Sequence, residues 1–409
     1  MNDLRRSAEV LFVLAVLLLA SGAFAPLWTD TSAHDVIDGS PALQFVWIAI
    51  YTAVVLLLLP RWKSIVTFLA ENKSFSLLIA LCIFSAAWSE EPAVTLRKAF
   101  AILGTTLVGL LLALRFDLRD QIRLIAATLG IAALASLVAV LFFPTLFRPT
   151  ELSGATWNGV FSHKNLLGRS MSLGTLGFLS LPRRKLLSYL LSFAGAAFCA
   201  AMLLTSHSQT ALLVMAALLV LLFLIPIFRW EWRQSIGSAL LMLTCCTPIV
   251  GMAIAHAGTA TAFLHRDTTL TGRAKIWTFA QLSFAKRPWL GYGYGSFWWV
   301  SRESRQAIAL IGYKTPHAHN AFLDLGLQLG LVGIVVFLAG WLIALMAAVR
   351  HLRGNAAHEA RWPLLYLVFI LLYSFTENSL LTPNSLLWIL YVAAIASVAP
   401  RLLHPVQKP

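Results

Sequence analysis

Residues that could carry out chemistry are concentrated in a few short stretches of this sequence. The most prominent stretch is His317-Ala-His319-Asn320, and Glu377 lies near the end of a later apolar run. An imidazole has a pKa close to neutrality, so it can accept a proton from a reacting hydroxyl group. A guanidinium such as that of Arg273 stays charged and grips anionic oxygen atoms. Together these residue types favour a site that binds an anionic, lipid-borne substrate.

Further polar residues fall on the same outer side of a membrane if the N-terminus is cytoplasmic. They are Arg97, Lys98, Arg148, Trp157, His163, Lys164, Asn165, Arg169, Ser206, His207, Ser208 and Asp324. Ionisable groups at helix ends inside a membrane are costly and by default indicate a functional site, so we expect one external, cation-rich cavity. Passive roles are the alternative: Arg97 can extend to lipid head groups, and His163 can merely cap the helix that follows it.

The two histidines of the His317-Ala-His319 stretch could in principle bind a metal ion. In a helix, however, a spacing of two residues places their rings on different faces. Neither a neighbouring cysteine nor a clear third ligand accompanies them. The sequence therefore argues against a metal site.

The elements that must position these residues are apolar. Of the 409 residues 59% are apolar and 12% are charged, whereas roughly 25% are charged in soluble globular proteins. A soluble fold has to cover itself with polar surface, so this composition excludes a soluble enzyme, a disordered chain and a fibre. The formal charge of +14 fits basic residues in cytoplasmic loops and beside anionic lipids. We therefore expect a polytopic membrane protein with lipid contacts and no nucleic acid partner.

About twelve apolar runs have roughly the 20 residues that a membrane-spanning helix needs. They lie near residues 8–27, 42–60, 74–89, 94–114, 122–143, 165–182, 186–205, 209–228, 235–256, 321–349, 362–381 and 385–400. Basic residues fill alternate loops, whereas the turns at 28–41, 206–208 and 382–384 contain no Lys or Arg. This pattern predicts an all-α protein in which residues 1–409 form one integral membrane domain with both termini in the cytoplasm.

The segment 257–320 differs from the other connections because it forms a long loop on the outer face. Loops of this length are commonly functional. Its stretch from Arg273 to Arg287 places apolar residues at helical spacing, with basic residues near both ends, and we expect a helix lying on the outer membrane surface. These apolar residues are Ile276, Trp277, Ala280 and Phe284. A glycine-rich turn and an aromatic anchor follow at 291–299.

Several of these blocks together resemble the O-antigen ligase and O-antigen polymerase superfamily. The signature of that family is similar to His319-Asn320, followed after nine residues by Gly330-Leu-Val-Gly333. The further similar blocks are Trp88-Ser with Pro92 and Thr95-Leu-Arg97, Phe161-Ser-His-Lys-Asn-Leu-Leu-Gly168, Thr271-Gly-Arg273 with Trp277, Arg287-Pro-Trp-Leu-Gly-Tyr-Gly-Tyr-Gly-Ser-Phe-Trp298, and Thr376-Glu377-Asn378-Ser379. They keep the family order over roughly residues 80–395, and the His-Lys-Asn block leans toward the exopolysaccharide-production and polymerase branch.

The resemblance implies a multi-spanning glycosyltransferase in the bacterial inner membrane that needs no metal and no other cofactor. Its donor would be a glycan linked to undecaprenyl diphosphate, taken from the periplasmic side with inversion of the anomeric configuration. The acceptor hydroxyl would belong to another repeat unit, to lipid A-core oligosaccharide or to a protein. Such an enzyme assembles lipopolysaccharide or exopolysaccharide.

The resemblance also implies roles for single residues. His319 matches the motif histidine and would act as the base or orient the acceptor, with His317 beside it and Glu377 holding a histidine or an arginine. Arg273 is the first candidate for binding the diphosphate. Supporting candidates for the diphosphate are Arg97, Lys164 and Arg169, and further site members are His163, Asn320, Ser206 and Ser208.

One position departs from the family pattern. Many relatives place Arg or Lys after the Ser206-x-Ser208 block, whereas this chain has Gln209, so one cation of the expected diphosphate site is missing or displaced.

Two other function classes remain as alternatives: a twelve-helix transporter or flippase of lipid-linked glycans, and a purely structural membrane subunit. A transporter usually has polar or broken helices near the bilayer midplane and an internal repeat, and the sequence shows neither.

Overall fold

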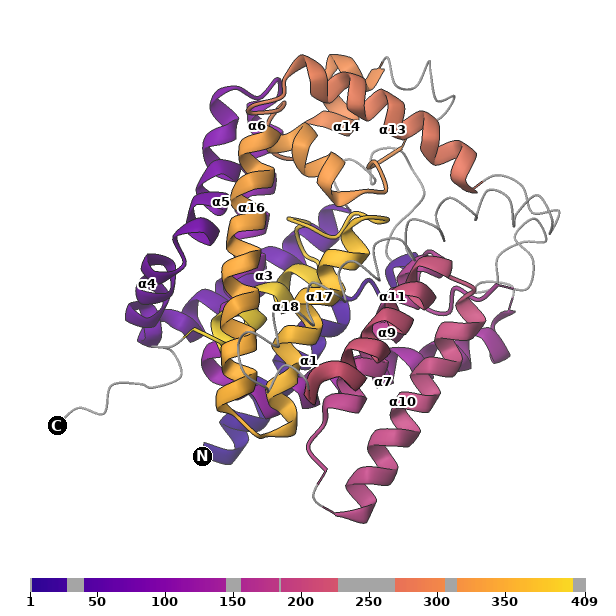
Figure 1. Cartoon of the computed structure of the whole chain (residues 1–409). Coiled ribbons are helices and arrows are strands. Elements are labelled where there is room, and N and C mark those ends of the chain that lie inside the picture. The colour runs from indigo at the N-terminus through magenta and orange to yellow at the C-terminus, as the bar shows by residue number, and fades with distance from the viewer. Residues whose placement is uncertain are drawn as a thin grey trace.

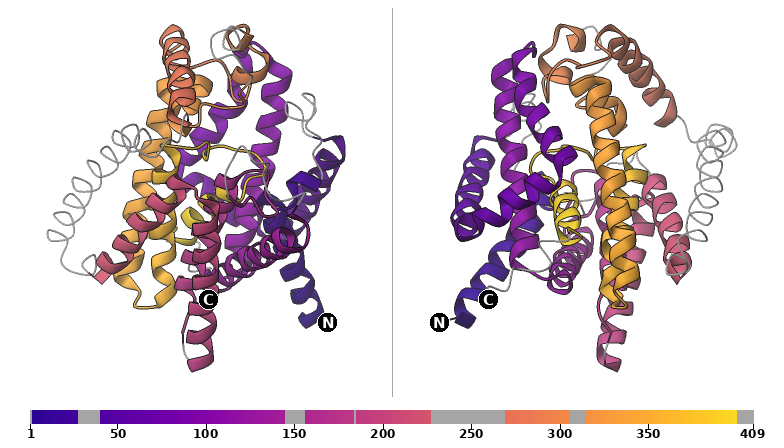
Figure 2. Two further views of the ribbon diagram at one scale, coloured as in Figure 1. Left: turned by 90° about the vertical axis from the view of Figure 1, so that its right-hand side faces the viewer. Right: turned by 60° about the vertical axis from the view of Figure 1, so that its left-hand side comes forward.

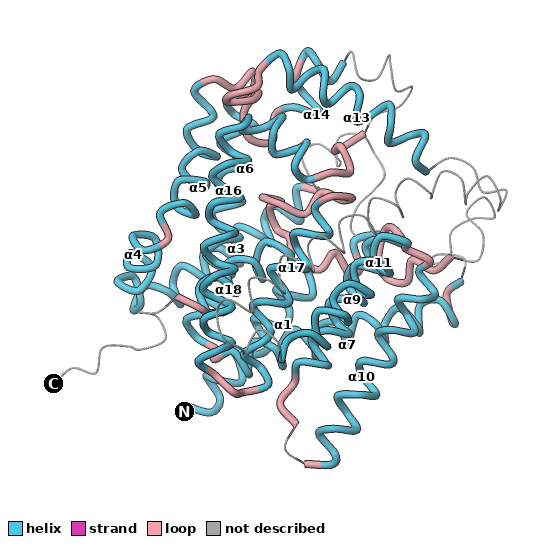
Figure 3. Tube along the Cα trace, in the orientation of Figure 1, coloured by secondary structure: helices cyan, strands magenta, loops and turns pink. Residues whose placement is uncertain are grey.

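The computed structural model describes residues 2–27, 40–144, 156–183, 185–226, 269–305 and 315–399. Within these ranges every regular element is a helix (Figures 1 and 3). The helices are α1 (Asn2–Ala20), α3 (Pro41–Leu58), α4 (Trp62–Glu71), α5 (Lys73–Phe84), α6 (Pro92–Arg115), α7 (Leu118–Phe142), α9 (Lys164–Ser180), α10 (Leu186–Ser206), α11 (Gln209–Leu224), α13 (Thr269–Lys286), α14 (Phe297–Val300), α16 (Ala321–Gly354), α17 (Trp362–Ser374) and α18 (Leu386–Ser397).

Within the described residues the expectation of an all-helical protein is confirmed, and the helices are consistent with a membrane protein. In the part of the chain that the structure describes, five helices are long and apolar enough to cross a membrane, namely Pro41–Glu71, Pro92–Arg115, Leu118–Phe142, Leu186–Ser206 and Ala321–Gly354. Each predicted run within the described residues contains a helix, whereas the run at 235–256 lies outside them. Twelve spans, a periplasmic loop and the direction of the termini stay predictions.

The centre of the bundle is built around α18, which is buried along its whole length. Small residues let α6 approach it closely, because a Cβ on Gly109 would lie 2.6 Å from Cβ of Val392. The indole of Trp388 donates to the hydroxyl of Thr106 at 2.9 Å, so the one polar group of this ring is satisfied inside the core. Close approach through small residues and interhelical hydrogen bonds is typical of helix packing in membranes.

Two central helices are too short to span a bilayer. At 1.5 Å per residue, the 13 residues of α17 and the 12 residues of α18 extend only about 20 Å, against about 30 Å of hydrocarbon. The loop that joins them therefore lies deep in the molecule, well below α13 and α14 (Figure 1). Protein groups form hydrogen bonds with several of its polar atoms: Tyr294 donates to the carbonyl of Leu381 at 2.5 Å, and the amide of Asn384 donates to Thr105 at 2.9 Å.

The predicted apolar run at 321–349 is helical, as expected, but α16 bends sharply at Gly330. The backbone there has φ 67° and ψ −165°, a region that is essentially open only to glycine. The rings of Phe322 and Phe337 lie 6.3 Å apart, although fifteen residues of continuous helix would separate them by about 22 Å. Residues 321–329 therefore fold back along the rest of α16, and their N-terminus returns to the middle of the molecule.

The helix expected in the long loop is present as α13, but its apolar face is not free to lie on a membrane. Ile276 and Ala280 are buried against Tyr292, Phe297 and Leu327. Both views in Figure 2 place α13 at the end of the bundle opposite the N-terminus. The helical spacing predicted from the sequence is correct. The apolar face of α13, however, packs on protein and not on lipid, because the glycine-rich turn and α14 cover it.

The bend at Gly330 gives a prediction for stability. A Cβ at this position would lie 2.1 Å from the carbonyl oxygen of Trp289, and the backbone conformation excludes alanine as well. We expect Gly330→Ala to destabilise the protein by about 1–3 kcal/mol or more, measured as a lower melting temperature in detergent. Gly354→Ala in the same helix is the control, because a Cβ there meets nothing within 4 Å. Equal melting temperatures of the two variants would contradict the structure at this bend.

Candidate active site

The candidate site is organised around the carboxylate of Glu377, in the loop between α17 and α18. Its Oε1 accepts from Nη2 of Arg273 at 2.9 Å and from Nδ2 of Asn165 at 2.7 Å. Its Oε2 lies 3.3 Å from Nδ1 of His319. The side chain of Glu377 is only 11% exposed, so the carboxylate is partnered on both oxygen atoms in a nearly dry setting. The structure thus brings together His319, Arg273 and Glu377.

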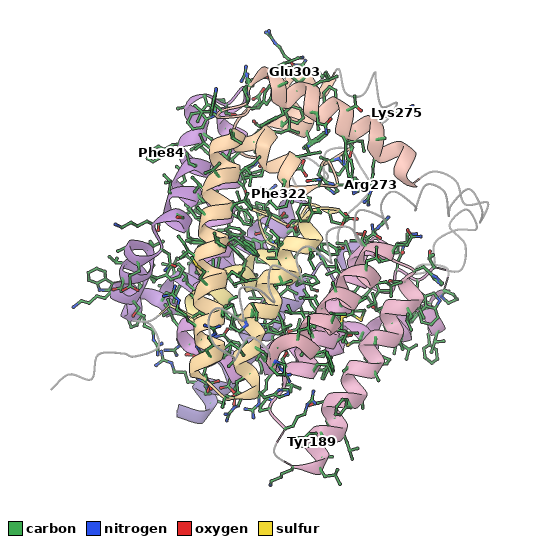
Figure 4. All side chains as sticks on the ribbon, viewed as in Figure 1. Phe84, Tyr189, Arg273, Lys275, Glu303 and Phe322 are labelled. Atoms are coloured by element: carbon green, nitrogen blue, oxygen red, sulfur yellow. The ribbon has the colours of Figure 1, made fainter. Side chains whose placement is uncertain are left out.

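Arg273 reaches this carboxylate from the second turn of α13. Its Nη1 also donates to the backbone carbonyl of Thr376 at 3.0 Å, so both terminal nitrogens of the guanidinium hold the loop. The neighbouring cation Lys275 is exposed on the same helix, and Figure 4 labels both side chains. Arg273 therefore ties α13 to the deep loop, and 20% of its side chain stays accessible.

Asn165 is a site residue to which the sequence assigned no role. Besides Glu377, its side-chain oxygen accepts from the hydroxyl of Ser208 at 3.1 Å. Its backbone carbonyl accepts from the hydroxyl of Tyr373 at 3.1 Å. Because an ionised carboxylate can only accept hydrogen bonds, the side-chain nitrogen Nδ2 of Asn165, and not its oxygen, must face Glu377. Its position inside the Phe161–Gly168 block, among the polar residues of the expected outer side, was the signal that pointed to it.

His319 adopts the left-handed backbone conformation, with φ 51°, immediately before the residue that caps α16. Its backbone N–H donates to Nδ1 of His317 at 3.2 Å, and the two rings meet edge to face at 4.2 Å. The side chain of Asn320 accepts from the amides of Phe322 and Leu323. The two histidines therefore lie in a tight turn, not in a helix, and Asn320 holds the start of the folded-back segment.

Hydrogen bonds with the side chains of Asp324 and Trp277 hold the turn that carries the two histidines. Oδ1 of Asp324 accepts from the amide of Ala318 at 2.9 Å and from the indole of Trp298 at 2.6 Å. The indole of Trp277 donates to the carbonyl of Ala318 at 2.9 Å. The backbone N–H and C=O of Ala318, the residue between the histidines, are thus both hydrogen-bonded to side chains of α16 and α13, and Trp298 of α14 holds Asp324 in turn. These bonds restrict the positions that the two imidazoles can take.

The N-terminus of α9 enters the site from the opposite side. His163 is the N-cap, and its Nδ1 accepts from the amide of Asn165 at 3.2 Å. The capping alternative for His163 is therefore correct as far as this nitrogen is concerned. Lys164 begins α9, and Arg169 lies one turn further along it. The first turns of α9 and α16 thus both meet the cluster, and helix N-termini favour negative charge.

The remaining predicted residues lie in a second layer or apart. Ser208 reaches the cluster through Asn165, and Ser206 supports Ser208 by accepting its amide at 3.2 Å. Arg97 is exposed on α6, next to Lys98, whose side chain packs against Gly295 of the glycine-rich turn. The described contacts of the Glu377 carboxylate do not include Arg97.

The surroundings lower the pKa values of both Glu377 and His317, which favours the charged form of the carboxylate and the neutral form of the imidazole. Burial alone would raise the pKa of Glu377, but the hydrogen bond from His319 and the charge of Arg273 outweigh it and lower that pKa to about 2. Burial and, to a smaller extent, the neighbouring His319 lower the pKa of His317 to about 4. At neutral pH the site therefore holds an ionised carboxylate beside a neutral His317. Among the described residues, no group of three His, Cys, Asp or Glu is arranged to hold a metal ion.

Glu377 gives a stability prediction with a defined pH dependence. Its pKa is depressed in the folded protein, so its contribution is fully present above about pH 4.5 and is lost as the pH falls toward about 2. We expect Glu377→Gln to lower the unfolding free energy at pH 7 by an amount on the order of 3 kcal/mol, and the melting temperatures to converge at acidic pH. Glu303→Gln, which breaks an ion pair with the exposed Lys286, should cost at most about 1 kcal/mol. A gap between wild type and Glu377→Gln that stays constant from pH 7 to 3 would contradict this assignment.

Comparisons with known proteins agree with the resemblance of the sequence blocks. A sequence model of the family described as O-antigen ligase matches residues 194–338. The exopolysaccharide production protein ExoQ of Rhizobium meliloti (strain 1021) is 26% identical over 344 residues, which cover 80% of this chain and 77% of the relative. A putative polysaccharide ligase of Rickettsia felis is 24% identical over 123 residues, which cover 29% of this chain and 30% of the relative. These matches, together with the apolar helices, indicate a multi-pass membrane protein with a role in surface polysaccharide assembly, and they support the resemblance to the O-antigen ligase superfamily.

Proposed function

We propose that the protein is a glycosyltransferase that moves a glycan from undecaprenyl diphosphate to an acceptor hydroxyl on the periplasmic face of the bacterial inner membrane. The observation that carries the proposal is the shared contact of one buried carboxylate with an imidazole and a guanidinium, those of His319 and Arg273. This arrangement unites a proton acceptor with a fixed cation. The similarity to the O-antigen ligase family supports a polysaccharide substrate, and the exopolysaccharide relative favours polymerisation of repeat units over ligation to lipid A-core.

His319 is the base in this proposal. Because Glu377 is ionised, Nδ1 of a neutral His319 must carry the proton that it shares with Oε2. Nε2 then keeps its lone pair and can take the proton of the attacking hydroxyl. Orientation of a histidine by a carboxylate is the arrangement found in other nucleophile-activating sites, and general base catalysis contributes typically about 10²–10⁴-fold.

The cations stabilise the leaving group. As the acceptor oxygen bonds to the anomeric carbon, the bond from that carbon to the diphosphate breaks and its electron pair stays on the diphosphate. Arg273 is placed to neutralise this growing charge, supported by Lys164 and Arg169 on α9 and by the N-terminal ends of α9 and α16. The hydroxyl proton passes to His319. A single displacement of this kind inverts the anomeric configuration.

A transporter or flippase of lipid-linked glycans is the second candidate. The observation in its favour is the short pair α17 and α18 with a deep irregular loop, since interrupted helices near the midplane are typical of transporters. Such a protein would move the lipid-linked glycan without changing its covalent structure. Transport does not call for an imidazole oriented by an ionised carboxylate, which is why glycan transfer is the first proposal.

The base and the cation can be tested in proteoliposomes supplied with undecaprenyl-diphosphate glycan, by separating polymer, acceptor-linked product and unchanged donor. We expect His319→Ala to slow transfer by about 10²–10⁴-fold and Arg273→Ala by at least about 10²-fold. Lys275→Ala is the matched control, because it removes an exposed cation from the same helix, and it should transfer at the wild-type rate. Wild-type transfer by the His319 or Arg273 variant refutes that assignment. Flipping of the donor without any product would favour the transporter.

The absence of a metal requirement is a separate prediction. Because the charge of the leaving group falls to Arg273 and its neighbouring cations, we expect the rate of transfer to be unchanged by EDTA. Loss of activity in EDTA that is restored by added Mg²⁺, Mn²⁺ or Zn²⁺ would show that the reaction uses a metal and would revive the histidine pair as a ligand set.

A further inference from the structure

We propose that His163 is a substrate-binding residue that presents a neutral Nε2–H to an oxygen atom of the diphosphate. The proposal deepens the function proposed above and rests on it. It gives His163 a task that its role as a helix cap does not require. It also assigns the imidazoles of His163 and His319 opposite tautomers within one site.

The tautomer of His163 follows from its hydrogen bond to the backbone. Nδ1 accepts from the amide of Asn165 at 3.2 Å, so this nitrogen cannot carry a proton while the bond exists. A neutral imidazole holds its proton on the other nitrogen, which leaves Nε2–H as a donor. His319 has the reverse arrangement, because its Nδ1 faces the ionised Glu377.

The position of His163 makes this donor available to a ligand. Asn165 connects the two sides of the site. Its backbone N–H donates to Nδ1 of His163, and its side-chain Nδ2 donates to Oε1 of Glu377 at 2.7 Å. The His163 side chain is exposed, whereas the other partners of Asn165, Ser208 and Tyr373, are buried. Nε2–H is therefore a polar group on an exposed side chain of this turn.

The surroundings keep this imidazole neutral. Although solvent reaches the ring, the protein atoms around it desolvate the charged form and lower the pKa of His163, against the opposing effect of Glu377. Lys164, His319 and Arg273 lower that pKa further. Protonation would also break the bond to the amide of Asn165, so the cap and the neutral state support each other.

A diphosphate oxygen is the acceptor that suits this donor. His163 immediately precedes Lys164 at the start of α9, and Arg273 faces the same carboxylate-bearing loop. The three side chains would therefore present one neutral and two charged donors to one anion. A neutral donor adds direction to binding without a further full charge, whereas the acceptor hydroxyl is left to His319.

Two substitutions separate the cap from the donor. Asparagine is a strong N-cap residue, so His163→Asn keeps the bond to the backbone but is too short to replace Nε2–H. The amide of His163→Gln can reach the place of Nε2–H but caps the helix poorly. Asp117→Ala is the matched control, because it removes the cap of α7, where Asp117 accepts from the amide of Asp120 at 2.8 Å, outside the site.

The probe is undecaprenyl diphosphate itself, titrated into purified protein in nanodiscs, with melting temperatures measured in parallel. We expect His163→Asn to weaken binding about tenfold or more with a near wild-type melting temperature. His163→Gln should weaken binding less but melt earlier, and Asp117→Ala should melt earlier and bind like wild type. In nuclear magnetic resonance spectra of protein with ¹⁵N-labelled histidine, the signal that His163→Asn removes should be that of an imidazole with its proton on Nε2.

Several outcomes would overturn the proposal. It is wrong if His163→Asn binds undecaprenyl diphosphate like wild type, if His163→Gln binds more weakly than His163→Asn, or if the lost signal is the Nδ1–H form. A protein that binds undecaprenyl diphosphate with this order of affinities but transfers no glycan would instead refute the proposed transferase and leave the role of His163 intact.

Discussion

The structure of this protein depends on the need of one buried carboxylate for partners. An ionised carboxylate that is nearly removed from water is costly unless donors surround it, and Glu377 obtains them from three separate parts of the chain. Arg273 comes from α13, His319 from the turn before α16, and Asn165 from the start of α9. Satisfying this charge therefore draws together segments far apart in the sequence, and the same contacts orient the groups that a glycan transfer needs.

Two features of the backbone bring these segments to one depth. The shortness of α17 and α18 places Glu377 below the end of the bundle, and the bend at Gly330 returns His319 to the same level. Irregular backbone inside a membrane protein is tolerated only where protein or a water-filled cavity satisfies it. Here Tyr294, Thr105 and Trp277 supply those hydrogen bonds, so the apolar core and the polar site support each other.

The helices could be predicted from the sequence, because apolar runs carry that information locally. The placement of the polar residues on one side of a membrane, inferred from the basic loops, stays a prediction. The grouping of His319, Arg273 and Glu377 was expected on that basis, and their roles stay predictions. The bend of α16 could not be predicted, since an isolated glycine in an apolar run is compatible with a straight helix. The importance of Asn165 and the buried face of α13 depend on contacts between distant segments, which local patterns do not contain.

The most direct test of the account is an experimental map of the full-length protein in lipid nanodiscs with undecaprenyl diphosphate bound. We expect diphosphate density within hydrogen-bond distance of Arg273 and beside the first turn of α9, with the side chains of His319 and Arg273 both in contact with Glu377. Diphosphate density elsewhere, or the three side chains in separate regions of the molecule, would contradict it.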